Sequence, residues 1–193
     1  MKKINTLIFI LVISILLVGC GSKDTYKLKG DYSQCQPYMD NIIKQGQINF
    51  STTETNQPSK NNDVVWIDYT GYVNNKTFDG GTAKNQPLLL GSNTFIDNFE
   101  EQLLNHKAGD SVDVNVTFPS NYSVTSLAGK KALFKVKINK VSSLISVDQL
   151  IAILKKQAPD QYKEVTTTND LKNYLCDLML TQQDTSSQDT TSK

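Results

Sequence analysis

Hydrophobic and polar residues alternate through the middle of the chain, and this period of two is typical of half-buried β-strands. Three segments follow the pattern, at residues 64–73, 112–118 and 132–138. A short apolar run at residues 88–90 predicts a further buried strand. Asn74 and Asn75 can adopt the positive φ angles of a tight hairpin turn, which would lead into another strand from Lys76. The alternation therefore predicts an antiparallel sheet.

Helical periodicity appears once between these strands and again on both sides of them. Residues 98–106 predict one helix laid in the curved sheet. Further on, Ser146 and Gln149 form a capping-box pattern, and apolar residues then recur one helical turn apart until Pro159. Two more helices are expected within residues 31–50 and from 169 to about 180. The fold class that follows is α+β, with flanking helical segments.

The first twenty residues have the features of an export signal. Two lysines precede an almost entirely apolar run over residues 4–18. The sequence LVGC at residues 17–20 resembles the bacterial lipobox, in which the cysteine is acylated and the bond before it is cut. The alternative is an uncleaved N-terminal anchor. We expect an extracytoplasmic protein that a lipid on Cys20 anchors to the bacterial cell membrane.

Shifts in composition divide the chain into five segments. A polar stretch rich in turn-forming residues precedes the first strand, and a low-complexity stretch ends the chain. The expected segments are a signal peptide (1–19), a lipid-anchored tether with a short helical part (20–61), the α+β domain (62–142), a two-helix segment (143–181) and a disordered tail (182–193).

Charge and composition exclude several function classes. The chain has 193 residues, 20 lysines without any arginine, and a formal net charge of +1, so it lacks the strong cationic excess typical of nucleic-acid-binding proteins. One histidine and three separated cysteines are too few for a structural zinc site. We therefore expect no nucleic acid partner and no metal.

Motifs for ordinary catalysis are also missing from the sequence. It contains no nucleophile elbow and no phosphate-binding glycine loop. Glu100 and Glu101 are adjacent, so on a helix their side chains diverge, and His106 lies at an expected helix end that solvent should reach. The sequence therefore predicts no acid–base, covalent or cofactor chemistry.

Short motifs in the middle domain point instead to a known family. In chain order they are DYTG (68–71), TFDGG (77–81), LGS (90–92), FIDNFEEQL (95–103), HKAGD (106–110), VTFP (116–119), Tyr122 and LAGK (127–130). This succession closely resembles the FKBP-type peptidyl-prolyl cis-trans isomerase domain, most of all the version found in trigger factor chaperones. The resemblance covers residues 62–142 and implies a half-barrel of five or six antiparallel strands wrapped on one helix.

The resemblance also implies an apolar pocket between the helix and the sheet. Its catalytic positions correspond to Tyr69, Phe78, Asp79, Ile96, Phe99, Tyr122 and Phe134, with Phe95 and Leu90 as substrate-binding residues. The implied roles are a carbonyl held by the Ile96 backbone N–H and a prolyl ring gripped by phenyl rings. The flap arginine of the family is absent, because the chain has no arginine, and this departure weighs against macrolide binding more than against isomerase activity.

The sequence leaves two questions open beside this interpretation. Cys35 and Cys176 flank the domain and either form a disulfide or remain two buried thiols. The flanking helices either hold unfolded chains or cover a sheet edge. We expect an isomerase that acts on X-Pro bonds of unfolded or partly folded exported polypeptides, and the alternative is a non-catalytic peptide-binding or chaperone module on the same fold.

Overall fold

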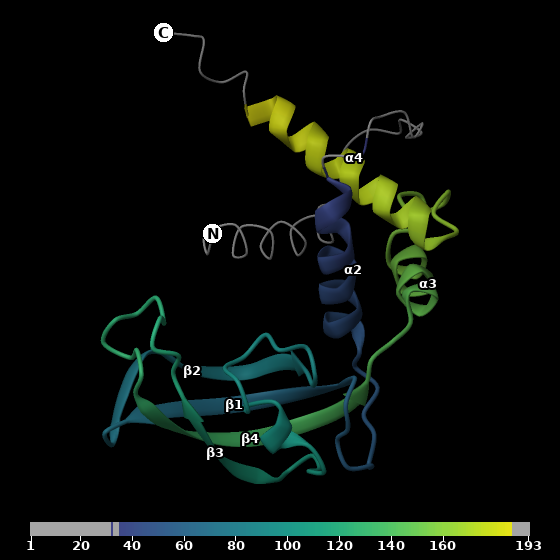
Figure 1. The fold of residues 1–193 in the computed structure, drawn as a ribbon. Coiled ribbons are helices and arrows are strands. Elements are labelled where there is room, and N and C mark those ends of the chain that lie inside the picture. The colour runs from purple at the N-terminus through teal and green to yellow at the C-terminus, as the bar shows by residue number, and fades with distance from the viewer. Residues whose placement is uncertain (1–31, 33–34, 187–193) are drawn as a thin grey trace, which may run out of the picture. The chain divides into compact units, whose positions relative to one another are not determined.

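The computed structural model describes Tyr32 and residues 35–186, with side chains up to Met179 (Figure 1). The chain folds as two compact units. One is formed by Ile48–Leu144 and is called the sheet unit here, and the other takes the parts of the chain on either side of it and is called the helical unit. The predictions for the signal peptide, for Cys20 and for residues 187–193 of the expected tail lie outside the described residues. The start of that tail was predicted wrongly, because residues 182–186 belong to a helix that ends at Ser186.

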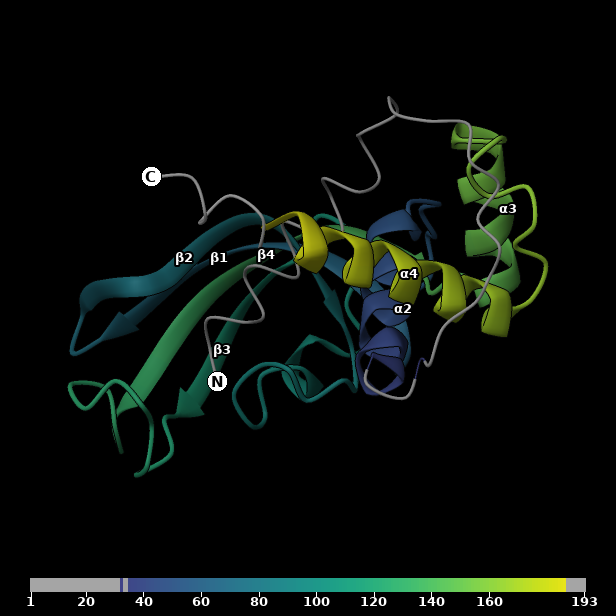
Figure 2. The same cartoon turned by 90° about the horizontal axis from the view of Figure 1, so that it is seen from above.

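The sheet unit contains one four-stranded antiparallel sheet in the order β2-β1-β4-β3. Its strands are β1 (Asp63–Val73), β2 (Lys76–Leu89), β3 (Ser111–Thr117) and β4 (Lys131–Ser143), which lie side by side in a curved sheet (Figures 1 and 2). The five or six strands implied by the resemblance are not seen in the described residues, because residues 76–78 and 88–89 belong to one long strand, β2.

The turn between β1 and β2 has the conformation that its sequence predicts. Asn74 and Asn75 have φ angles of 50° and 60°, both positive, as a tight two-residue hairpin turn requires. Farther along the hairpin, β1 advances two residues from Thr70 to Tyr72 while β2 covers the five positions from Thr82 to Thr77. The extra residues of β2 form a bulge that contains Phe78 and Asp79.

A second irregularity is held by the carboxylate of Asp68. Its Oδ1 accepts hydrogen bonds from the Asn85 backbone N–H and from the Asn139 side chain, both at 2.7 Å. Asn85 lies at a register shift in β2, and Asn139 lies at one in β4. These hydrogen bonds, that from Asn85 first, lower the pKa of Asp68. One side chain of the central strand thus fixes both neighbouring strands.

The predicted helix over residues 98–106 is wrong. The structure has only a single 3₁₀ turn there, η1 (Glu101–Leu103), within a series of turns. Asn98 and Asn105 adopt positive φ angles of 65° and 64°, which a right-handed helix does not contain. The Gln102 side chain bonds both the backbone N–H and the carbonyl of Asn115 in the edge strand β3, so this turn is also attached to the sheet.

The helical unit contains α2 (Gln36–Phe50, which continues into the sheet unit), α3 (Val147–Gln157) and α4 (Thr168–Ser186). The capping box of Ser146 and Gln149 is present at the start of α3, as the sequence predicts. Of the two alternatives for the cysteines, the structure has the disulfide, which joins Cys35 before α2 to Cys176 in α4. No helix within the described range is long and apolar enough to cross a membrane.

Candidate functional site

Aromatic side chains form one connected cluster on the buried face of the sheet unit. Phe134 of β4 is central, with ring centroids 5.4 Å from Phe99 and 5.9 Å from both Tyr69 and Phe78. Phe95 extends the cluster on one side, because its centroid lies 4.8 Å from Phe99. Most contacts are edge-on, the arrangement that the charge distribution of aromatic rings favours. The cluster is therefore a packed apolar wall.

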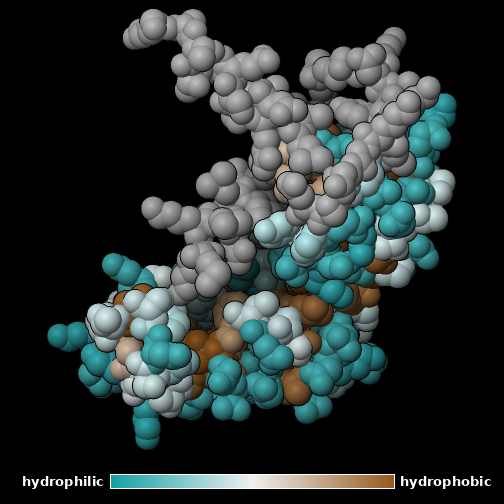
Figure 3. All heavy atoms as spheres, turned by 45° about the horizontal axis from the view of Figure 1, so that its top comes forward, coloured by the Kyte–Doolittle hydropathy of each residue, from teal (hydrophilic) through white to brown (hydrophobic). Residues whose placement is uncertain are grey.

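Each part of the cluster is supplied by a different element. Tyr69 and Phe134 stand on β1 and β4, at positions that the period of two directs to the core face, and Phe78 comes from the bulge of β2. The segment between β2 and β3 contributes Phe95 and Phe99. Phe99 and Phe134 are buried, whereas Tyr69, Phe78 and Phe95 are half-buried and give the cluster an accessible side. On the face seen in Figure 3, hydrophobic residues of the sheet unit gather together with hydrophilic ones around them.

Glycines make this packing possible at two positions. A Cβ on Gly71 of β1 would lie 2.5 Å from the Phe134 ring and 2.9 Å from the Phe78 ring. A Cβ on Gly81 would lie 2.8 Å from the Phe78 ring. Real Cβ atoms do not approach other atoms so closely, so the two phenyl rings occupy space that any other residue would fill.

The sequence-predicted residues fall into three groups in the structure. Tyr69, Phe78, Phe95, Phe99 and Phe134 are brought together, with Ile96 packed against the same core. Tyr122 is connected to the cluster through the ring of Phe118. Asp79 is exposed at the β2 bulge and is not part of the cluster, and Leu90 is fully buried in the same core as Phe99.

Sequence reasoning missed two residues that the structure places at the site. Phe118 connects Tyr122, at 4.8 Å between ring centroids, to Phe78, at 5.7 Å. The signal for it was present, since Phe118 ends the alternating segment 112–118, directly after β3, and belongs to a quoted motif. Glu100 is the other: its buried carboxylate accepts hydrogen bonds from the loop that carries Phe95, a contact that no local pattern indicates.

The electrostatics of the cluster fit an apolar site. Its members are uncharged, and burial raises the pKa of the Tyr69 hydroxyl, which therefore stays neutral throughout the physiological range. Within the described part of the chain, no group of three or more His, Cys, Asp or Glu side chains is placed to hold a metal ion. The arrangement can bind an apolar group beside a few polar ones, and it offers no positioned acid, base or nucleophile.

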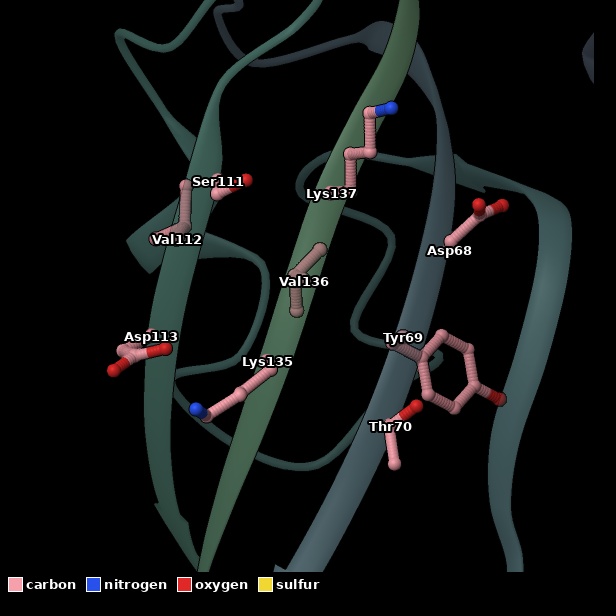
Figure 4. A pocket seen from close by; sticks show the side chains of 9 residues that line it. All are labelled: Asp68, Tyr69, Thr70, Ser111, Val112, Asp113, Lys135, Val136 and Lys137. Atoms are coloured by element: carbon pink, nitrogen blue, oxygen red, sulfur yellow. The ribbon is translucent and has the colours of Figure 1, made fainter.

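A hollow of about 350 Å³ lies on the strands β1, β3 and β4, and Tyr69 of the cluster is among the residues that line it (Figure 4). Its lining includes Asp68, Asp113, Lys135 and Lys137, and Asp113 stands directly opposite Lys135 and Asp68 opposite Lys137 in the strand register. Alternation directs these side chains to the polar face of the sheet. Cross-strand pairs of opposite charge are ordinary sheet stabilisation, so the aromatic cluster is the better candidate site.

Comparison with known families agrees with this geometry. Residues 55–139 match the family described as FKBP-type peptidyl-prolyl cis-trans isomerase. This match contains nearly the whole sheet and every member of the aromatic cluster. Residues 55–139, which lie in the sheet unit, are therefore similar to an FKBP-type peptidyl-prolyl isomerase domain.

Within this class, the domain is similar to part of trigger factor. The trigger factor of Malacoplasma penetrans is 53% identical over 103 residues, which is 53% of this chain and 23% of that protein. That of Lactobacillus gasseri is 59% identical over 81 residues, which is 42% of this chain and 18% of that protein. A solved structure of the trigger factor chaperone, described for promiscuous substrate recognition, aligns with 84% of this chain and 36% of its own at 19% identity and a TM-score of 0.48. The chain thus spans about a quarter of the length of these curated relatives or less.

Proposed function

We propose that this protein is a peptidyl-prolyl cis-trans isomerase. The observation that carries the proposal is the connected, half-buried aromatic cluster in an FKBP-type domain. Rotation about a peptide bond faces a barrier of about 18–20 kcal/mol because amide resonance is lost in the twisted state. The twisted imide is less polar than the planar one, so an apolar, dehydrated site binds it preferentially without any proton transfer.

The proposed roles follow from where the residues lie. Phe99 is buried at the base of the cluster and, with Phe78 and Phe134, packs against the prolyl ring. The backbone N–H of Ile96 holds the carbonyl beside the ring, as the family resemblance implies. The neutral Tyr69 hydroxyl supplies a hydrogen bond at the accessible side.

The substrates that we propose are exported polypeptides at the outer face of the cell membrane. This part rests on the apolar N-terminal run and the lipobox-like sequence that ends at Cys20. X-Pro isomerisation takes tens of seconds or longer without a catalyst, so it can limit the folding of chains that emerge unfolded from translocation.

Lipid anchoring is tested by fractionation. The protein expressed in a bacterial host should sediment with membranes and carry an acyl mass on Cys20, and Cys20→Ser should abolish the acyl mass. An unmodified Cys20 in the membrane-bound protein would contradict lipid anchoring while leaving the isomerase proposal intact.

Isomerase function is tested on a client protein whose refolding is limited by one X-Pro bond. The full chain should accelerate this slow phase at substoichiometric concentration, and Phe99→Ala should lose the acceleration if far-UV circular dichroism shows it folded. The half-buried Phe95→Ala is the second variant, in case removal of the buried Phe99 ring prevents folding. An unchanged slow phase with the parent protein would contradict the proposal.

A second candidate function is binding of unfolded chains without catalysis. Tyr38 on α2 favours it, because this large hydrophobic residue is 49% exposed in the helical unit. Aggregation of a client that lacks proline separates the two functions. A chain-binding protein suppresses this aggregation, and Tyr38→Ser should weaken the suppression, whereas a pure isomerase has no effect.

A further inference from the structure

Glu100 is a buried carboxylate beside the aromatic cluster. Only 5% of the residue is exposed, and no lysine or histidine of the described chain forms an ion pair with it. A buried charge without a counter-ion is unfavourable unless hydrogen-bond donors replace the water that it has lost. The hydrogen-bond donors around Glu100 therefore show which segment of the chain its carboxylate fixes.

All of these donors come from one short loop, residues 92–95. Oε1 accepts from the backbone N–H groups of Thr94 at 2.9 Å and Phe95 at 3.2 Å, and Oε2 accepts from that of Asn93 at 3.1 Å. Oε1 also accepts from the hydroxyl groups of Ser92 at 3.2 Å and Thr94 at 3.4 Å. Three successive N–H groups thus converge on one carboxylate, as they do in backbone anion sites.

This loop carries the accessible wall of the candidate site. Phe95 belongs to it, and Ile96 follows directly and packs against the core. The loop is also held in an uncommon conformation, because Asn93 within it has a positive φ angle of 53°, as does Asn98 shortly after it, at 65°. Glu100 follows Phe99, so the same turn supplies both the base of the cluster and the carboxylate that holds its wall.

We propose that Glu100 is the positioning residue of this site. It fixes the Phe95 ring and the Ile96 backbone N–H in place before a peptide binds, so that binding does not have to order the loop. This inference rests on the proposed isomerase function and adds a specific residue to it, one that acts through Phe95 and Ile96 and does not touch the substrate.

The kinetic test compares Glu100→Gln with Glu101→Gln in the full chain. Glutamine keeps the size of the side chain, but its NH₂ group faces N–H donors that it cannot accept from. For Glu100→Gln we expect a higher KM and a kcat/KM that is lower by about tenfold to a hundredfold, the range that small misplacements cost. Glu101 is exposed and one residue away, so Glu101→Gln makes the same change of charge and should be neutral.

Amide hydrogen exchange distinguishes positioning from a purely structural role. Glu100→Gln should speed exchange at Asn93, Thr94 and Phe95 while the strand amides keep parental rates. Thr94→Val removes one hydroxyl donor to Glu100 and should speed exchange at the same amides by a smaller factor. It replaces Glu100→Gln in the test if that variant does not fold. Uniformly faster exchange, or parental kinetics in a folded Glu100→Gln, would overturn the inference. A parent protein without activity would contradict the isomerase proposal instead, and loop exchange would still show whether Glu100 fixes the loop.

Discussion

Two phenyl rings lie against the backbone of β1 at the place where a side chain would normally project. Gly71 leaves this place empty, and the rings of Phe78 and Phe134 fill it from the neighbouring strands. The fit depends on the β2 bulge, because the extra residues bring Phe78 over the central strand. The geometry of the candidate site therefore depends on a missing Cβ as much as on the rings themselves.

Gly71→Ala should disturb stability and activity together. The new Cβ would meet the Phe134 and Phe78 rings at 2.5 and 2.9 Å, and overpacking of this kind costs about 1–3 kcal/mol. Urea unfolding and the peptide exchange rate measure the two effects. Gly46→Ala is the control, because its Cβ meets only the movable Leu150 side chain at 3.1 Å and a helix interior favours alanine over glycine. Equal unfolding free energies for the two variants would contradict this account.

The sequence identified most of the aromatic residues but not their connections. Tyr69 and Phe78 could be named because each lies in a family motif, and Phe134 because it lies in the alternating strand that follows the last motif. Phe118 links Tyr122 to the cluster because the fold brings it against Phe78 of β2, which is distant in the sequence. Glu100 holds its loop through five donors of residues 92–95, which converge on the carboxylate only in the folded structure. Asp79 matched a motif position, yet its exposure follows from the bulge, which no local pattern specified.

At the scale of single elements, strong local signals predicted the structure well. The capping box at Ser146 and the paired asparagines of the hairpin are complete within a few residues, so the sequence alone specifies them. The segment 98–106 has apolar residues at helical spacing, but positive φ angles at Asn98 and Asn105 leave room for a single turn between them. Tertiary contacts overrode local propensity there.

The start of α4 makes a pH-dependent contribution to stability. The hydroxyl and the backbone N–H of Thr166 donate to the Asp170 carboxylate and lower its pKa to about 2. The unfolded value is about 3.9, so the contribution is complete above that pH and is lost as the pH falls toward 2. Asp170→Asn should therefore destabilise the helical unit by about 1 kcal/mol at pH 7 and scarcely at pH 2.

Chemical denaturation at both pH values, followed by circular dichroism, measures this difference. The matched control is Asp160→Asn, which changes the charge of an exposed residue between α3 and α4. A destabilisation of Asp170→Asn that is the same at pH 7 and pH 2 would show that the carboxylate charge does not support the helix.

At the scale of the whole molecule, the disulfide joins segments that are 141 residues apart in the chain. Further contacts accompany it in the helical unit, where Lys172 forms an ion pair with Asp40 at 2.7 Å and Gln36 bonds Asn173 at 3.3 Å. From the sequence, pairing and two free thiols were both compatible with the cysteine positions, because only the packing of α2 against α4 decides between them.

Loss of the disulfide should weaken the helical unit selectively. A cross-link over a loop of this length stabilises by up to about 5 kcal/mol in the chain-entropy model. The three cysteines of the chain all lie outside the sheet unit, so its amides are the internal control. We expect Cys35→Ser with Cys176→Ser to speed hydrogen exchange in α2 and α4 by at least tenfold and to leave β1 and β4 at parental rates. Equal acceleration in both units would contradict this.

The central claim is that the aromatic cluster catalyses X-Pro rotation. The most direct measurement is cis-trans exchange of a short X-Pro peptide by exchange NMR, with the full chain, Phe95→Ala and, as the control, Tyr38→Ala. We predict that the parent and Tyr38→Ala accelerate exchange equally and that folded Phe95→Ala is slower by tenfold or more, about 1.4 kcal/mol of transition-state stabilisation. Absence of acceleration by the parent protein across a panel of X residues would contradict the claim.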